Sequence, residues 1–197
     1  MAETDPLTQL EAAAEVAQQA IEGVPAAQWS APSTCEGWSV EDVVRHVVEG
    51  NERLAAALTQ EGDVHGGAGG GGTSAPHSGD GMPWAERHRA SAGAVVAGFR
   101  RPGALERPVT VPAGTMPGRF VVSLRTVESL VHGWDVATST GQRLRPPDDL
   151  VAHADRETRA LLDRIPPDRR PFHPPTSPPP GSTPLDRLAA LLGRPVD

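Results

Sequence analysis

The chain has 197 residues and a formal net charge of −7 at pH 7, so its length fits a single domain of ordinary size. The acidic balance, without any run of basic residues, argues against a nucleic-acid-binding protein. The sole cysteine, Cys35, excludes an internal disulfide framework, and the absence of lysine excludes Schiff-base chemistry. No apolar run is long enough to span a membrane and the N-terminus is acidic and polar, so we expect a cytoplasmic protein without a signal peptide.

Helical spacing of apolar residues predicts two helices in the first third of the chain. The first covers residues 5–22 and is closed by Gly23. The second begins at Ser39, where Asp42 resembles the acidic residue of a capping box, and its apolar stripe runs over residues 40–58. Residues 62–81 are rich in glycine and serine, and we expect this segment to be mobile.

The second half of the chain predicts further helices separated by proline and glycine. We expect helices over residues 83–100, 118–140, 148–164 and 185–192. Residues 103–117 are interpreted as a connector with a short extended run at 108–111 that does not join a sheet. Residues 166–184 are proline-rich and are expected to form little regular structure.

These elements predict an all-α fold, a bundle of four main helices with extra C-terminal helices and a proline-rich tail. We expect residues 1–165 to form the helical bundle. Residues 166–197 are expected to form a tail whose short helix docks back on the same domain through its leucines.

Glu128 and His132 stand four residues apart on the fourth helix, so they occupy successive turns of one face. Asp135 lies three residues further on, on the same side. The neighbouring residues are apolar, so this face is turned at least partly toward the core. A carboxylate and an imidazole at that depth must be paired, hydrogen-bonded or bound to a metal.

His46 lies at the margin of the apolar stripe of the second helix. If this helix faces the fourth, His46, Glu128 and His132 converge as two imidazoles and one carboxylate, a ligand set of catalytic zinc sites that leaves one position open. The alternative is a simple Glu–His hydrogen bond along one helix. Asp135 is either a solvated or capping carboxylate, or the acceptor for the second N–H of a ligand imidazole.

Three segments of the chain carry motifs of a known family. They are residues 35–46 (CEGWSVEDVVRH), 128–142 (ESLVHGWDVATSTGQ) and 184–195 (PLDRLAALLGRP). The first two resemble signatures of the DinB-like superfamily and, more closely, of the mycothiol-dependent maleylpyruvate isomerase N-terminal family and its actinobacterial metal-binding relatives. The third is similar to the closing segment of those relatives.

The resemblance implies one divalent metal ion, usually zinc, held between the helices by His46, Glu128 and His132. It also implies mycothiol, a low-molecular-weight thiol, as co-substrate. A metal-bound thiolate would add to an electrophilic small molecule, in a mycothiol S-transferase or isomerase reaction. The short tail in place of the isomerase's C-terminal domain argues against maleylpyruvate itself as the substrate.

Other functions use the same ligand set. One alternative is another metal-dependent enzyme on this fold, a hydrolase or a tailoring enzyme, and two histidines with one carboxylate also bind non-haem Fe(II). A further alternative is a non-catalytic metal-binding protein. In each case we expect no nucleic-acid or membrane partner, and a monomer or homodimer.

Several residues beside the motifs carry weaker expectations. Trp38 and Trp134 are expected to pack in the core near the floor of the metal site, because large aromatic side chains tend to be buried. Cys35 is expected to be a structural cysteine rather than a reactive thiol of low pKa. Arg45 and Arg125 neighbour the motif residues without having to face the metal, because adjacent helix positions point in different directions.

Overall fold

The computed structural model describes residues 5–59, 81–112, 114–165 and 172–196. It confirms the all-α fold. The main elements are α1 (Pro6–Glu22), α2 (Val40–Thr59), α3 (Trp84–Phe99), β1 (Pro108–Val111), β2 (Gly114–Pro117), α4 (Gly118–Ser139), α5 (Asp148–Arg164) and α6 (Pro184–Leu191), with one turn of 3-10 helix at Ala26–Gln28. Each helix begins and ends within two residues of its predicted bounds. No helix of the described residues is long and apolar enough to cross a membrane.

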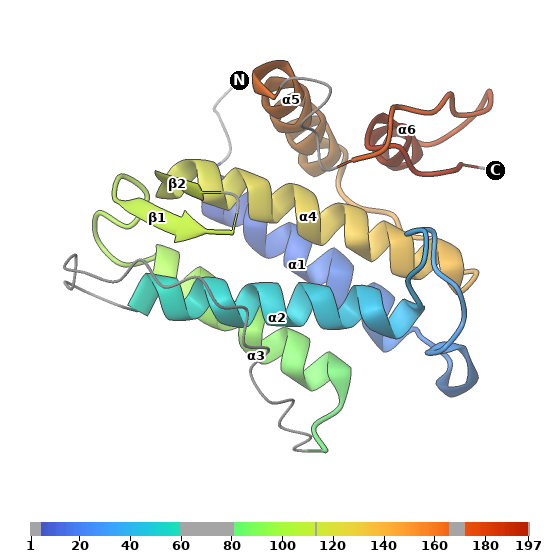
Figure 1. The fold of residues 1–197 in the computed structure, drawn as a ribbon, viewed down its shortest axis with the longest axis horizontal. Helices are drawn as coiled ribbons and strands as arrows, with labels where there is room; N and C mark the ends of the chain where they lie inside the picture. Colours follow the sequence, from blue (N-terminus) through green and yellow to red (C-terminus); the bar gives the residue numbers. More distant parts are fainter. Residues whose placement is uncertain (1–4, 60–80, 113, 166–171, 197) are drawn as a thin grey trace.

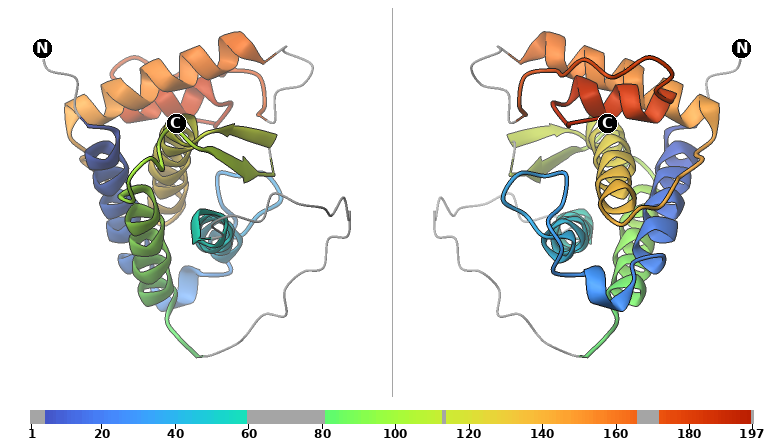
Figure 2. Two further views of the ribbon diagram at one scale, coloured as in Figure 1. Left: turned by 90° about the vertical axis from the view of Figure 1, so that its left-hand side faces the viewer. Right: turned by 90° about the vertical axis from the view of Figure 1, so that its right-hand side faces the viewer.

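Four helices form the bundle (Figure 1). α1 packs against α3 and α4, and α2 packs against the same two helices. The views along the bundle show α5 crossing over it, with α6 beside α5 (Figure 2). α5 and α6 both contact α4, so the helix that carries the second motif lies at the centre of the molecule.

The start of α2 is fixed by its cap. The Ser39 hydroxyl accepts the backbone N–H of Asp42 at 3.2 Å, and the Asp42 carboxylate accepts the backbone N–H of Ser39 at 3.0 Å. These reciprocal bonds satisfy two N–H groups at the end of the helix. The predicted capping role of Asp42 is confirmed, and the cap fixes where His46 falls on the helix.

A glycine on α4 permits a close approach to α1. A Cβ atom on Gly133 would lie 3.0 Å from the Cα atom of Ala17. Small residues at both positions therefore bring the two backbones together, one residue after His132. This close approach of α1 and α4 sets the position of the α4 backbone at His132.

The prediction that residues 103–117 contain no sheet was wrong. β1 and β2 form an antiparallel hairpin, with Val109 opposite Met116 and Val111 opposite Gly114. Gly114 has φ of +120°, a conformation that suits glycine at the turn. The extended run predicted at 108–111 is confirmed as β1, but its pairing with β2 was not predicted. Val109 is buried in the core that α1, α2, α3 and α4 share, and this tertiary contact stabilises the short hairpin.

The tail docks on the bundle through α6. Thr183 and Asp186 form a capping box at the start of the helix, and Leu185 and Leu188 are buried against α4 and α5. The Nε1–H of Trp134 donates to the Asp186 carboxylate at 2.8 Å. The predicted docking of the last helix is confirmed.

Two predicted segments fall wholly or partly outside the described residues. The glycine-rich segment 62–81 lies outside them except for Gly81, so its mobility stays a prediction. Of the proline-rich segment, residues 172–183 contain no helix or strand, as predicted, and residues 166–171 lie outside.

Candidate metal centre

α2 and α4 bring two of the predicted ligands side by side. The rings of His46 and His132 lie with their centroids 5.1 Å apart, at an angle of 75°. The ring of Trp38 lies edge-on to His46 at the same centroid distance. His46 therefore contacts both an aromatic side chain of the preceding loop and the imidazole of α4.

Asp135 fixes the orientation of His132. The Nδ1 atom of His132 lies 2.9 Å from Oδ2 of Asp135, and the Asp135 side chain is fully buried. A carboxylate accepts hydrogen bonds, so Nδ1 carries the proton and Nε2 is left with its lone pair. That is the tautomer in which Nε2 can bind a metal ion.

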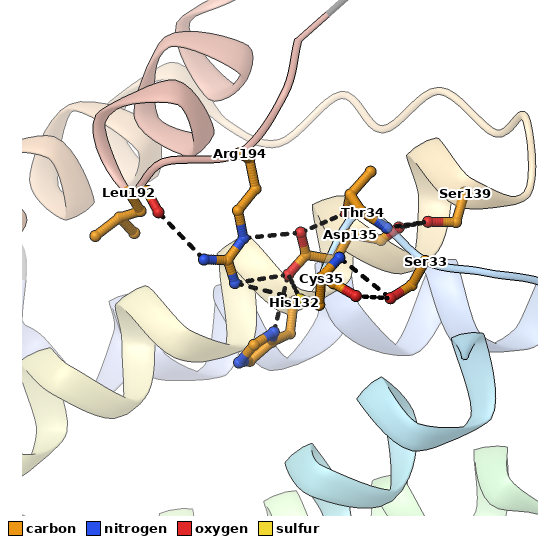
Figure 3. Close-up of polar contacts among 8 residues, drawn as sticks. All are labelled: Ser33, Thr34, Cys35, His132, Asp135, Ser139, Leu192 and Arg194. Atoms are coloured by element: carbon orange, nitrogen blue, oxygen red, sulfur yellow. Dashed lines mark hydrogen bonds and ion pairs between the residues drawn. The ribbon is translucent and has the colours of Figure 1, made fainter. Parts of the chain in front are cut away.

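The Asp135 carboxylate has further donors around it (Figure 3). Thr34 Oγ1 donates to Oδ1 at 2.7 Å, and Cys35 Sγ lies 3.1 Å from Oδ2. The Arg194 guanidinium bonds to both oxygens, through Nε at 3.1 Å and Nη2 at 3.0 Å. Burial alone would raise the pKa of the Asp135 carboxyl, but the bonds from His132 and the charge of Arg194 outweigh it and hold that pKa well below its usual range.

The third predicted ligand, Glu128, is paired with a buried arginine. Arg125 Nη1 donates to Glu128 Oε2 at 3.0 Å, and burial lowers the pKa of Arg125 while Glu128 opposes that shift. A Cβ atom on Gly50 would lie 2.7 Å from Arg125 Nη1, so the absence of a side chain on α2 makes room for the guanidinium. One oxygen of Glu128, Oε1, has no bonding partner among the described residues.

A cavity of about 210 Å³ opens beside these groups. His46, Glu128 and Arg125 line it together with Arg53 and Thr110. The rest of its wall is Gly50, Leu54, Val111, Pro112, Val121 and Leu124, from α2, α4 and the hairpin. The hairpin missed from the sequence thus forms one side of the cavity.

His46 is uncharged at neutral pH. Burial lowers its pKa to about 4, and the neighbouring His132 acts in the same direction while Glu128 opposes it. A neutral imidazole is the form that binds a metal ion. The neutral imidazole of His46, with the imidazole of His132 and the carboxyl group of Glu128, thus fits a divalent cation by its chemistry.

A second set of donor atoms lies close by. Among the described residues, the metal-binding atoms of Cys35, His132 and Asp135 all lie within 4.8 Å of one another, whereas His46, Glu128 and His132 do not form so tight a set. Arg194 already supplies a positive charge to the set of Cys35, His132 and Asp135, because its Nη2 atom lies 3.4 Å from Cys35 Sγ. Burial and the Asp135 charge raise the pKa of the Cys35 thiol to about 12, so it is protonated. This chemistry favours Arg194 over an ion as the cation of that set.

Two expectations about neighbouring residues are settled. Cys35 is a structural cysteine, as expected, with its thiol bonded to Asp135. Trp134 is buried, as expected, but the prediction for Trp38 was wrong, because its side chain is 37% exposed. Trp38 lies in the loop before α2, where it covers the edge of His46 at the surface rather than filling the core.

Sequence reasoning named Arg125 as a neighbour without its ion pair to Glu128, and it missed Thr34 and Arg194. Arg125 stands three positions before Glu128 on the same helix, a spacing that could have indicated the ion pair. Thr34 and Arg194 reach Asp135 from 101 and 59 positions away, and no local spacing indicates such contacts. Arg194 does lie in the third motif, which was the available signal.

Comparisons with known proteins show which family the chain belongs to. The sequence profile of the mycothiol maleylpyruvate isomerase N-terminal domain matches residues 10–137. The chain belongs to this family. The matched region contains all three predicted ligands and Asp135, but not Arg194.

Relatives extend the match over nearly the whole chain. The uncharacterized protein MT0763 of Mycobacterium tuberculosis strain CDC 1551 / Oshkosh is 31% identical over 195 residues, covering 98% of this chain and 99% of that protein. The uncharacterized protein Rv0738 of strain ATCC 25618 / H37Rv matches equally. The crystal structure of the mycothiol-dependent maleylpyruvate isomerase aligns with a TM-score of 0.58 at 17% identity, over 78% of this chain and 68% of that one. At that identity the alignment shows a shared fold.

Proposed function

We propose that this protein is a metal-dependent mycothiol S-transferase, which joins the sulfur of mycothiol to a small electrophile. The observation that carries the proposal is that His46 and Glu128 line one cavity and that the ring of His132 packs against His46, in a chain of the mycothiol maleylpyruvate isomerase N-terminal family. Zinc suits the donor set of two imidazoles and one carboxylate. Other divalent ions are accepted by the same ligands.

The three ligands have separate supports that orient them. Asp135 holds His132 with Nε2 available, Trp38 and His132 both contact the ring of His46, and Arg125 holds one oxygen of Glu128. A bound divalent cation would deprotonate a coordinated thiol and so supply a nucleophile at neutral pH. Three protein ligands leave a position for that thiol.

The cavity selects the second reactant. Its walls are mostly apolar, which favours a small molecule with an apolar body and excludes water around it. A volume of about 210 Å³ is below the usual range for drug-sized ligands, so the sugar portion of mycothiol would lie outside the cavity.

The proposed reaction is a conjugate addition. The thiol sulfur forms a bond to one carbon of an activated double bond, and the π electron pair moves to the neighbouring carbon, which takes up the proton released by the thiol. The product therefore contains every atom of both reactants. Reversal after rotation about the former double bond gives cis–trans isomerisation instead, with the thiol regenerated.

The test is conjugate formation, measured by mass spectrometry, with mycothiol, glutathione and cysteine offered against a panel of electrophiles. His46→Ala should abolish transfer and metal binding, because it removes a ligand that lies at the edge of the core. His153→Ala, on α5 and away from the cavity, is the matched control and should react like the wild type. Cys35→Ser should keep the metal.

Full activity of His46→Ala, or of protein stripped of metal, would refute the mechanism. Loss of the metal in Cys35→Ser, with His46→Ala retaining it, would move the ion to the set of Cys35, His132 and Asp135. A protein that binds the metal but leaves every thiol unreacted would favour a non-catalytic metal-binding function.

A further inference from the structure

The last residues described in the chain reach back to the candidate metal centre. The Arg194 side chain is 13% exposed and bonds to both oxygens of Asp135, which is fully buried. Asp135 in turn bonds to His132 Nδ1 at 2.9 Å. A continuous series of hydrogen bonds thus joins the C-terminal segment to an imidazole on α4 (Figure 3).

The backbone around Arg194 is fixed by the end of α6. Gly193 has φ of +80°, and the N–H groups of Gly193 and Arg194 bond to the carbonyls of Ala190 and Ala189 at 3.0 and 3.1 Å. These two bonds form a Schellman motif, which reverses the chain after the helix. The Arg194 carbonyl also accepts the hydroxyl of Thr176 at 2.7 Å.

The guanidinium is fixed as firmly as the backbone. Nη1 donates to the carbonyl of Leu192 at 3.2 Å, while Nε and Nη2 span the two carboxylate oxygens. A fork of two parallel N–H groups sets the plane of a carboxylate, which a single ammonium group cannot do. Arg194 is also the one arginine bonded to Asp135 among the described residues, so the charge of that buried carboxylate is balanced by it.

We propose that Arg194 is a positioning residue for the metal centre: it sets the Asp135 carboxylate, and Asp135 thereby holds His132 with Nε2 available for the metal. The inference rests on the proposed function for the metal-ligand role of His132. The hydrogen-bonded link itself is independent of any metal. The proposal gives Arg194, which lies outside the region that the family profile matches, a role in the metal centre.

The main test is the affinity for zinc, measured by competition with a chromogenic chelator on the full-length protein. Arg194→Met should weaken binding about 10- to 100-fold, the range for losing a partner behind a ligand. Arg194→Lys should fall between Arg194→Met and the wild type, because it keeps the charge without the fork. Arg187→Met removes an exposed arginine of α6 and should bind zinc like the wild type.

A backbone variant separates position from charge. A Cβ atom on Gly193 would lie 2.6 Å from the carbonyl oxygen of His173, and φ at this position is unfavourable for alanine. Gly193→Ala should therefore displace Arg194 without removing its charge, and should weaken zinc binding in the same direction as Arg194→Met. The fluorescence of Trp134, which bonds to Asp186, reports whether α6 stays docked.

The second readout needs no metal. In the metal-free wild type, the imidazole ¹⁵N signals of His132, assigned by their loss in His132→Gln, should show a protonated Nδ1 and an unprotonated Nε2. Arg194→Met should mix the two tautomers, whereas Arg187→Met should not. If the wild type binds no zinc, the proposed function fails and this readout alone decides the inference.

Wild-type zinc affinity and wild-type His132 signals in Arg194→Met would overturn the proposal. If α6 no longer docks in Arg194→Met, the zinc affinity of Arg194→Lys is compared with that of Arg187→Met instead. Equal affinities in those two variants would also overturn the proposal.

Discussion

His88 on α3 is a buried histidine that belongs to the core rather than to the cavity. Its side chain is 1% exposed, and Nδ1 lies 2.6 Å from Gln18 Oε1. Because the Gln18 amide nitrogen already donates to Glu22 and to the carbonyl of Ala85, the Gln18 oxygen accepts and His88 Nδ1 carries the proton. His88 Nε2 has no partner among the described residues.

This environment predicts a loss of stability in acid. Burial lowers the pKa of His88 to about 4 from an ordinary 6.5, and the charges of Arg125 and Arg89 add to the shift. The unfolded chain therefore binds the proton first. The contribution is present above pH 6.5, is lost as the pH falls toward 4, and amounts to on the order of 3 kcal/mol.

His88→Gln removes this titration while keeping a donor for Gln18. The free energy of unfolding, measured with urea between pH 4 and 8, should fall less steeply below pH 6.5 in the variant than in the wild type. His153→Gln provides the control, since it makes the same substitution on α5, outside the group of residues around His88. Parallel pH profiles for the wild type and His88→Gln would contradict the prediction.

At the scale of elements, two glycines in helices have opposite surroundings. Gly133 on α4 lies against the backbone of Ala17, whereas a Cβ atom on Gly93 of α3 would have nothing within 4 Å. A helix gains about 1 kcal/mol when alanine replaces glycine in open space. An added methyl group at a packed contact costs about 1–3 kcal/mol.

We therefore expect Gly93→Ala to raise the free energy of unfolding by up to about 1 kcal/mol, and Gly133→Ala to lower it or leave it without that gain. Urea unfolding of both variants beside the wild type measures the difference. An equal gain in the two variants would show that α1 and α4 can move apart freely. In that case the contact of Gly133 with Ala17 would not set the position of the α4 backbone at His132.

At the scale of the molecule, the core is independent of the candidate metal centre. There are three clusters of buried apolar residues. One joins α1, α4, α5 and α6, one joins α1, α2, α3, β1 and α4, and one joins α1, α2 and α4; none contains a predicted ligand. A chain of this length buries enough surface to fold without a metal.

Under the proposed function, removal of the bound metal should thus abolish transfer without unfolding the protein. Chelation is expected to leave the far-ultraviolet circular dichroism unchanged. It should lower Tm only because the folded state loses the stabilisation from metal binding. That stabilisation contributes about 2.7 kcal/mol to the free energy of unfolding when the free metal is at a hundred times its Kd. Readdition of zinc should restore both Tm and activity. Loss of the helical signal on chelation would instead make the metal a structural one.

Much of the fold was determined locally and could be predicted from the sequence. The helices follow from apolar periodicity, and their ends follow from Ser39, Gly23 and the prolines, because capping and backbone preferences act within a few residues. The spacing of Glu128, His132 and Asp135 also predicted a shared helix face. Their family motifs were readable for the same reason, since each lies in one continuous segment.

Only the tertiary structure decided which distant groups meet. The hairpin exists because Val109 reaches a core shared by four helices, and Trp38 is exposed because the loop places it beside His46 at the surface. Arg194 reaches Asp135 across 59 positions through the docking of α6. Such contacts depend on how helices pack and where the chain reverses, and neither helical periodicity nor local spacing contains that information.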